Sequence, residues 1–348
     1  MSKTFTAQNP VTAKPVGDEI TEWDLIQTSA AIKAASAAIN GRNSFGAFMK
    51  LFRISNSPTV VSNSLVGAAV ATAVAPGSFA NTTQVAIVTA GVVIIYIAGM
   101  AINDYFDQVV DGHERPTRPI PAGQISPTTA LMCGMILLVA GMAACAFVSL
   151  DVLPWVMLLA SAVLAYNMLH LAKFVGPLLM GVCRALIPVI AAIALSPIQT
   201  PAWNILVFFA LPLGLAGASI SLVARNEMST SHASPSTQSA RTMFATALMG
   251  LAALAPLGAI ATRTVEPMSN FMTLTYMISL ALVGISIFRG LVLLGHPYAA
   301  FKGVMRWIAA LSLMDAASLC ILNQPVLAYA SIGCFILAIL LQRRVAGS

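Results

Sequence analysis

Charged residues are scarce in this sequence. Of its 348 residues, 9% are Asp, Glu, Lys or Arg and 58% are hydrophobic, whereas soluble domains carry about 25% charged residues. This composition excludes an ordinary soluble domain. It also excludes a nucleic-acid-binding domain, despite the net charge of +6, because such a domain needs a soluble basic face.

Cysteine and histidine are also few, and neither shows paired spacing. The five cysteines lie inside long apolar runs, and the four histidines are scattered along the chain. Neither set has the spacing of a disulfide framework or of a zinc site. We therefore expect the cysteines to be small core residues: Cys133, Cys145, Cys183, Cys320 and Cys334.

The apolar residues are arranged in long runs of roughly 17 to 24 residues, enough for a helix to cross a hydrocarbon core about 30 Å thick. The runs are continuous and rich in Ala, Leu and Met. They favour helices over a barrel, whose strands alternate between two faces. Ten spans are predicted, near 58–76, 84–102, 128–149, 153–171, 177–196, 203–223, 243–262, 270–292, 304–322 and 326–342.

This pattern predicts an all-α polytopic membrane protein with about nine to ten transmembrane helices. Residues 1–50 are expected to form a polar N-terminal arm on the cytoplasmic side. Residues 51–345 are expected to form a single transmembrane domain.

Lysine and arginine indicate the direction of insertion, because short cytoplasmic loops collect them. With the N-terminus inside, sixteen of the 18 basic residues lie on the cytoplasmic side and one, Arg263, lies outside. Arg184 falls within a span. We therefore expect an integral multi-pass protein of the bacterial inner membrane, with both termini cytoplasmic.

Four of the 12 acidic residues stand in one short segment directly after the second predicted span. Asp104, Asp107 and Asp111 are spaced so that their carboxylates project from one face of a helix, with Asn103 at its edge. Like charges at this spacing repel, so a cluster that faces the bundle needs a cation. Mg²⁺ suits this cluster because it prefers a few carboxylate oxygens with water and phosphate oxygens. A solvated acidic loop is the alternative interpretation.

Two arginines follow in the segment RPTRPIP. Arg115 and Arg118 stand beside prolines, which restrict the backbone and reduce the entropy lost when the side chains are aimed. Arginine matches phosphate oxygens with a planar fork of donors. Acids and arginines together predict a site for a metal-neutralised polyphosphate near the cytoplasmic face. The alternative is that the arginines only set the topology.

The segment from Asn103 to Arg118 resembles the first signature of the UbiA-type intramembrane prenyltransferases. Two further segments resemble the family's first span and its fourth and fifth spans: LFRISNSPTVVSNSLVG and YNMLHLAKFVGPLLMGVCRAL. The residues that match in these two segments are Arg53, Asn56, Asn63, Tyr166, Asn167, Lys173 and Arg184.

The resemblance implies a ring of membrane helices around a central cavity. It implies Mg²⁺-dependent transfer of an isoprenyl chain from a prenyl diphosphate to an aromatic or lipid-like acceptor within the membrane. Asp104, Asp107 and Asp111 would bind the metal and act in catalysis. Tyr96, Tyr166 and Asn167 would line the substrate cavity, where the tyrosine rings face a developing cation. The residues expected at the diphosphate are Asn56, Asn63, Asn103, Arg115, Arg118, Lys173, Arg184, Arg225 and Asn226.

The family's second aspartate signature is altered in this chain. The loop after the sixth span reads SLVARNEMSTSHASPSTQSART and contains no aspartate. It offers Arg225 and Asn226 as diphosphate contacts and Glu227 as its single carboxylate, which we expect to act in catalysis. This variant, together with GPLLMGVCRAL, is similar to the EboC-type branch of the superfamily.

Two charged residues fall inside predicted spans, where an unpaired charge costs at least about 2.5–3.5 kcal/mol. Arg184 is expected to point into a polar cavity. Asp315 either acts at the site or forms a structural hydrogen bond between helices.

Two alternatives to transfer remain open. One is a membrane terpene cyclase that uses the same metal and diphosphate site, and the other is a non-catalytic subunit that binds or carries a prenyl lipid. A transporter would need repeated halves with broken helices, which the sequence does not show.

Overall fold

The computed structural model describes residues 45–74, 81–169, 172, 174–196, 202–228, 235–262, 264–294 and 300–344, with the side chains of 202, 225–228 and 235–238 left out. Most of the expected N-terminal arm therefore lies outside the described residues. Within them the ordered structure is helical, with no strand.

The ten predicted spans are confirmed as ten long apolar helices in the described part of the chain. They are α3 (Ser57–Val74), α4 (Thr82–Phe106), α6 (Pro127–Val148), α7 (Leu153–Leu169), α8 (Val175–Leu195), α9 (Ala202–Met228), α10 (Pro235–Leu254), α12 (Asn270–Leu294), α13 (Ala300–Ile321) and α14 (Pro325–Arg344). Nine of them lie within about five residues of the run that predicted them. The seventh, predicted near 243–262, covers Ser239–Ala261 and consists of most of α10 followed by η3 (Ala255–Leu257) and α11 (Gly258–Ala261).

Short elements join or precede these spans. They are α2 (Phe45–Leu51), η1 (Ile54–Asn56), α5 (Gln108–Glu114), η2 (Leu150–Val152), η3 (Ala255–Leu257) and α11 (Gly258–Ala261).

Local sequence explains where the helices begin. Asn81 accepts a hydrogen bond from the backbone N–H of Thr83 at the start of α4, and Ser126 does the same for Thr129 at the start of α6. These are side-chain caps of the kind that Asn and Ser form best. Pro127 then occupies the first turn of α6, where a missing N–H has no consequence.

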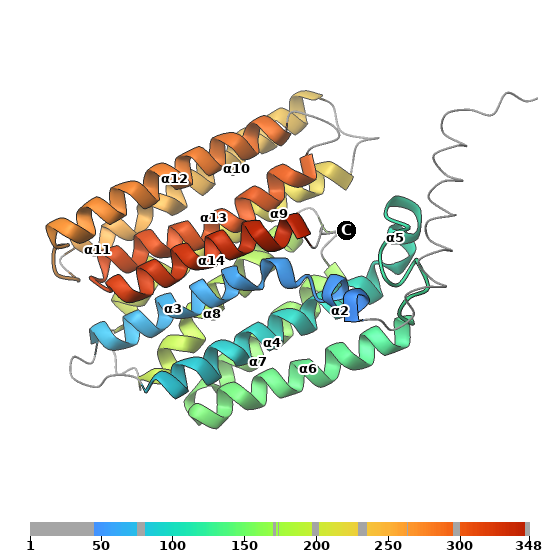
Figure 1. The fold of residues 1–348 in the computed structure, drawn as a ribbon, viewed down its shortest axis with the longest axis horizontal. Helices are drawn as coiled ribbons and strands as arrows, with labels where there is room; N and C mark the ends of the chain where they lie inside the picture. The colour runs from blue at the N-terminus through green and yellow to red at the C-terminus, as the bar shows by residue number, and fades with distance from the viewer. Residues whose placement is uncertain are drawn as a thin grey trace, which may run out of the picture.

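The spans form one bundle, with α6 at one edge, α10 and α12 at the other, and α3, α8 and α13 between them (Figure 1). The helix α13 is almost entirely buried because α3, α9, α12 and α14 pack around it. By contrast, α6 exposes Met132, Ile136 and Val139. An apolar surface of this kind is the expected face toward lipid.

Small residues let the central helices approach closely. A Cβ atom at Gly67 of α3 would clash with the backbone carbonyl of Pro188 on α8. Glycine at a helix crossing allows this approach, as is common between membrane helices. The approach places the polar residues of α3 opposite α8 at mid-bundle depth.

The fold-class prediction is therefore confirmed. The helices α4, α7, α8, α9 and α13, together with η1, surround a central cavity. The short elements α2 and α5 lie together at one end of the bundle (Figure 1). That end carries the mouth of the cavity.

Candidate active site

The mouth of the cavity begins at Arg53, between α2 and η1. Its backbone is left-handed, with φ 44° and ψ 47°, a conformation that costs a non-glycine residue about 1–3 kcal/mol. Its guanidinium donates to Asn103 Oδ1 at 3.0 Å and to Asp104 Oδ1 at 2.9 Å. The strained turn thus directs a cation at the end of α4.

Asp104 and Asp111 converge on Arg118. Arg118 Nη1 donates to Asp111 Oδ2 and lies 3.6 Å from Asp104 Oδ1. All three side chains are buried. The chain changes from α4 to α5 at Asp107, where the N–H of Asp107 bonds the carbonyl of Asn103 and the N–H of Asp111 bonds the carbonyl of Asp107. The acids therefore keep the helical spacing expected of them.

Burial opposes the ionised form of Asp111. It raises the pKa of the Asp111 carboxyl above its ordinary value, although the guanidinium of Arg118 acts in the opposite direction. Burial also lowers the pKa of Arg118, and the nearby charge of Arg53 adds to this effect. An added cation near Asp111 would favour its carboxylate form.

The carboxylates fit a magnesium ion that is shared with a ligand. The bonds that Asp104 and Asp111 make to described side chains use Oδ1 of the first and Oδ2 of the second. Across the described ranges, no three His, Cys, Asp or Glu side chains form a closed metal cage. Mg²⁺ is commonly held by one or two carboxylates plus substrate phosphates and water. The donor set matches that pattern.

The cavity behind this mouth has a volume of about 260 Å³. Its wall is polar at the mouth, where Arg53, Asn56, Asn103, Asp107, Arg115 and Arg118 contribute. Further in, it is mainly apolar, with Val92, Ile95, Leu159, Val163, Ile187, Ile220 and Leu311. This arrangement suits an amphiphile with a charged head and an apolar chain.

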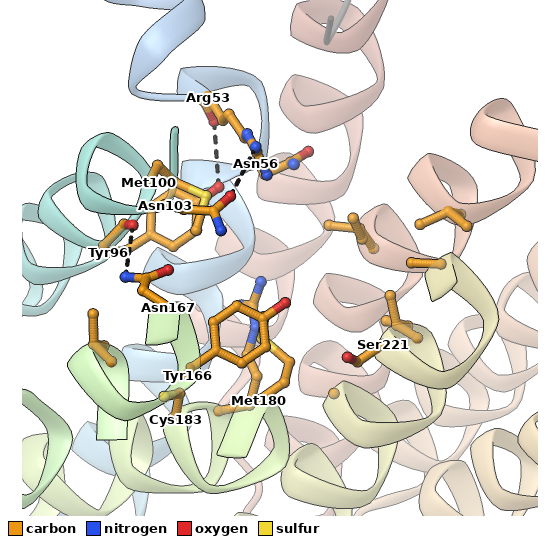
Figure 2. Close-up of a pocket in the computed structure, with 18 of the residues that line it drawn as sticks. Arg53, Asn56, Tyr96, Met100, Asn103, Tyr166, Asn167, Met180, Cys183 and Ser221 are labelled. Atoms are coloured by element: carbon orange, nitrogen blue, oxygen red, sulfur yellow. Dashed lines mark hydrogen bonds between the residues drawn. The ribbon is translucent and has the colours of Figure 1, made fainter. Parts of the chain in front are cut away.

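A few polar side chains interrupt the apolar wall. Tyr96 Oη donates to the carbonyl of Arg53 at 3.4 Å, and Asn167 Nδ2 donates to the carbonyl of Gly99 at 3.3 Å. Figure 2 shows Tyr96 beside Asn103, with Tyr166 and Cys183 farther from Arg53. Both tyrosine rings thus border the space next to the mouth.

Arg184 belongs to a second polar group, in the middle of the bundle. Its Nη1 donates to Thr59 Oγ1 at 3.1 Å and to Asn63 Oδ1 at 3.0 Å. The amide of Asn63 in turn donates to Asp315 Oδ2 at 2.7 Å, and Ser62 donates to the same oxygen. We call Thr59, Ser62, Asn63, Arg184 and Asp315 the mid-bundle network.

The structure brings most of the residues predicted from the sequence to one cavity. Arg53, Asn56, Tyr96, Asn103, Asp107, Arg115, Arg118, Tyr166, Asn167 and Arg184 line it. Asp104 and Asp111 adjoin it through Arg118. Asn63 contacts Arg184 in the mid-bundle network instead of lining the cavity itself.

The loop after the sixth span, which we call the second loop, and the segment before α8 are described only in part. Lys173 lies outside the described residues, as do the side chains of Arg225, Asn226 and Glu227. The backbone of these last three continues α9 directly beyond Ala224, which lines the cavity. Their place in the chain is therefore next to the mouth.

Sequence reasoning missed two features of the site. Gln342 of α14 donates to Asn56 Oδ1 at 3.2 Å and to the carbonyl of Met305 at 3.1 Å. Gly217 of α9 lies against the stem of Arg184. Neither residue stands in a recognisable motif, and only the helix packing shows their role.

Comparisons with known proteins agree with this geometry. A sequence profile of the UbiA prenyltransferase family matches residues 64–300. A digeranylgeranylglyceryl phosphate synthase from Methanothrix thermoacetophila is 49% identical over 55 residues, which are 16% of this chain and 21% of that protein. The enzyme of the same name from Haloquadratum walsbyi is 39% identical over 125 residues, covering 36% of this chain and 39% of that one.

These matches span well under half the length of the two curated relatives. An apo structure of a UbiA homologue from Aeropyrum pernix K1 has the same fold, with a TM-score of 0.59 and 17% identity, over 75% of this chain and 96% of that one. Because the family profile covers more than half of the sequence, this chain belongs to the UbiA prenyltransferase family.

Proposed function

We propose that this protein transfers an isoprenyl chain from a prenyl diphosphate to a lipid-like acceptor within the membrane, in a Mg²⁺-dependent reaction. The observation that carries the proposal is the pairing of Asp104 and Asp111 with Arg118 and Arg53 at the polar mouth of an otherwise apolar cavity. The names of the two relatives support a lipid-like acceptor. We propose that residues 51–345 form the single domain that performs this reaction.

In this proposal the diphosphate binds at the mouth, and the charged and polar residues of the wall there support this position. Arg115 and Arg118 present guanidinium groups to the cavity, and Asn56 and Asn103 add amide donors there. Guanidinium groups bind phosphate oxygens with charge-assisted hydrogen bonds. Asp104, Asp107 and Asp111 are the residues that would hold Mg²⁺. The bound metal supplies Lewis-acid stabilisation of the negative charge that develops on the leaving diphosphate.

The prenyl chain extends from the mouth into the apolar part of the cavity. A cavity of about 260 Å³ is smaller than the ~300–1,000 Å³ that encloses a drug-sized ligand. It therefore holds the reacting head groups, while the rest of a long chain passes between helices toward lipid. Tyr96 and Tyr166 border this region and can face an allylic cation with their rings.

The second loop completes the charge balance in this proposal. Glu227 is its only carboxylate, and Arg225 and Asn226 can donate to phosphate oxygens. Lys173 precedes α8 and is the remaining candidate for a diphosphate contact. We assign all four to the mouth, because α8 begins and α9 ends at that end of the bundle.

We infer that the mouth faces the cytoplasm. Gln342 near the end of α14 bonds Asn56 at the mouth, and α2 lies at the same end (Figure 1). The end with the mouth thus carries both ends of the described chain and the arginines of the first loop. The positive-inside rule supports a cytoplasmic position for this side, and we propose the bacterial inner membrane as the location.

One observation favours a second candidate, a prenyl-lipid binding subunit. The second loop contains no aspartate, so fewer carboxylates are present to neutralise a departing diphosphate. A terpene cyclase differs from both in needing no acceptor. The three functions therefore differ in when diphosphate is released.

The deciding experiment measures diphosphate release from geranylgeranyl diphosphate by the purified protein in nanodiscs. It is run with Mg²⁺ or with a chelator, and with or without a membrane lipid extract as a source of acceptors. Transfer predicts release that needs both Mg²⁺ and the extract, together with a new prenylated lipid in the mass spectrum. Release without the extract would indicate a cyclase, and binding without release a carrier.

A further inference from the structure

Arg184 is a buried cation in the wall of the cavity that has no acidic partner within ion-pair distance among the described residues. Its exposed fraction is 9%, and the three ion pairs of the described chain all belong to the mouth. Its hydrogen bonds to Thr59 and Asn63 both use Nη1. The edge formed by Nε and Nη2 makes no bond to a described residue.

The position of the guanidinium is fixed at both ends. Thr59 and Asn63 hold Nη1, and Asn63 is itself held by Asp315. Gly217 of α9 lies against the stem, since a Cβ atom there would be 2.8 Å from Cγ of Arg184. The Arg184 side chain therefore has one donor edge left for a ligand. Arg184 is one of the residues that line the cavity.

This edge lies deeper than the mouth. Thr59 and Asn63 lie two and six residues after Ser57, where α3 begins, which is roughly 3 to 9 Å along the helix at 1.5 Å per residue. Arg184 shares no acid with Arg53 or Arg118. The family resemblance implied a diphosphate contact for Arg184, but the ion pairs among the described mouth residues do not include it.

We propose that Arg184 forms a separate anion subsite that binds the acidic group of the acceptor. The parallel N–H bonds of the Nε and Nη2 edge match two oxygens of a carboxylate or of a phosphate monoester. The surrounding wall is apolar, so the ligand is an amphiphile with an oxyanion. This inference rests on the proposed transfer reaction and specifies its acceptor class.

The charges of the network support an anionic ligand. Asp315 compensates Arg184 only across the amide of Asn63. A buried cation without a direct counter-ion is costly in a low dielectric. An oxyanion on the open edge would supply that counter-ion, whereas a neutral head group would not.

The test measures binding of octanoate, octyl phosphate and octanol to the full-length protein in phosphatidylcholine nanodiscs by saturation-transfer NMR, with empty nanodiscs as blank. We expect saturable binding of at least one octyl anion, and Arg184→Gln should weaken it by about 10- to 100-fold, as for loss of hydrogen bonds to a charged group. Octanol binding should not change. The anion that binds the parent protein more tightly identifies the acceptor group as carboxylate or phosphate.

The matched control is Arg289→Gln, which removes an exposed arginine of α12. It should leave the binding of all three probes unchanged. Arg184→Lys keeps the charge and removes the paired N–H donors of the guanidinium. It should therefore weaken binding of the octyl anions, and it tests the subsite even if the glutamine variant does not fold. Both Arg184 variants should bind geranylgeranyl diphosphate within about threefold of the parent, since each mouth contact is retained.

The subsite is disproved if the octyl anions do not bind the parent, or bind both Arg184 variants as they bind Arg289→Gln. It is equally disproved if Arg184→Gln lowers the affinity for geranylgeranyl diphosphate as strongly as it lowers the affinity for the octyl anions. The measurement involves no turnover. A protein that binds octyl anions through Arg184 but releases no diphosphate would therefore contradict the proposed transfer and leave the subsite standing.

Discussion

The mouth and the mid-bundle network handle buried charge in two different ways. At the mouth, Arg118 contacts Asp104 and Asp111 directly, and the groups come from the end of α4, from the short helix α5 and from the loop after it. In the network, Asn63 separates Arg184 from Asp315, and all residues come from long helices. The mouth is suited to exchanging ion-pair partners for a metal and a diphosphate. The network is suited to holding one donor edge in place.

The largest expected effect follows from removing a carboxylate at the mouth. Asp104→Asn deletes the charge that Arg53 and Arg118 share and one of the oxygens available to Mg²⁺. Turnover, measured as diphosphate release, should fall by on the order of 10²- to 10³-fold, as for loss of one preorganised transition-state contact. Asp151→Asn, at an exposed site in η2, serves as control and should keep parental activity.

Glu227→Gln is expected to have the next largest effect. It keeps the shape of the side chain and deletes the only carboxylate of the second loop, so turnover should fall by on the order of 10²-fold. Affinity for the diphosphate should fall less, because the mouth residues remain. Glu266→Gln, at an exposed position before α12, is the matched control. Full activity in the Glu227 variant would remove this residue from the site.

Asp315→Asn tests the network side of the comparison. The asparagine keeps one oxygen that can accept from Ser62 and Asn63. It deletes the charge that compensates Arg184, and it places an amide NH₂ where the second carboxylate oxygen has no partner among the described residues. We expect a loss of about 1–3 kcal/mol in stability, the range for an unsatisfied buried polar group. Thermal unfolding in nanodiscs measures it, with Asp151→Asn as reference. Equal unfolding temperatures for the two variants would show that the network does not depend on the charge.

Tyr96→Phe is expected to give the smallest effect. It removes the hydroxyl that reaches the carbonyl of Arg53 at 3.4 Å and keeps the ring. One neutral hydrogen bond contributes about 0.5–1.5 kcal/mol, so turnover should fall by roughly 2- to 12-fold. Tyr329→Phe on α14, an exposed tyrosine, controls for the substitution. A loss as large as that of Asp104→Asn would mean that the hydroxyl itself takes part in the chemistry.

The sequence predicted the spans well because transmembrane helices are set by local hydropathy, and ten runs became ten helices in the described chain. It also located the mouth, since Asn103 to Arg118 is one continuous motif. The mid-bundle network was only half visible. Arg184 and Asp315 stood out as charges within spans, but their link through Asn63 depends on how α3, α8 and α13 pack, which hydropathy does not determine. Gly217 and Gln342 carried no signal for the same reason.

The most direct test of the account is equilibrium binding of a non-hydrolysable geranylgeranyl thiolodiphosphate to the protein in nanodiscs, with and without Mg²⁺. The mouth is predicted to bind it in a Mg²⁺-dependent manner. Asp107→Asn, which alters a carboxylate that lines the cavity, should weaken binding by about 10-fold or more, the scale of hydrogen bonds to charged groups. Asp151→Asn should bind like the parent. Mg²⁺-independent binding, or equal affinity of the Asp107 variant and the parent, would contradict the assignment of the diphosphate to the mouth.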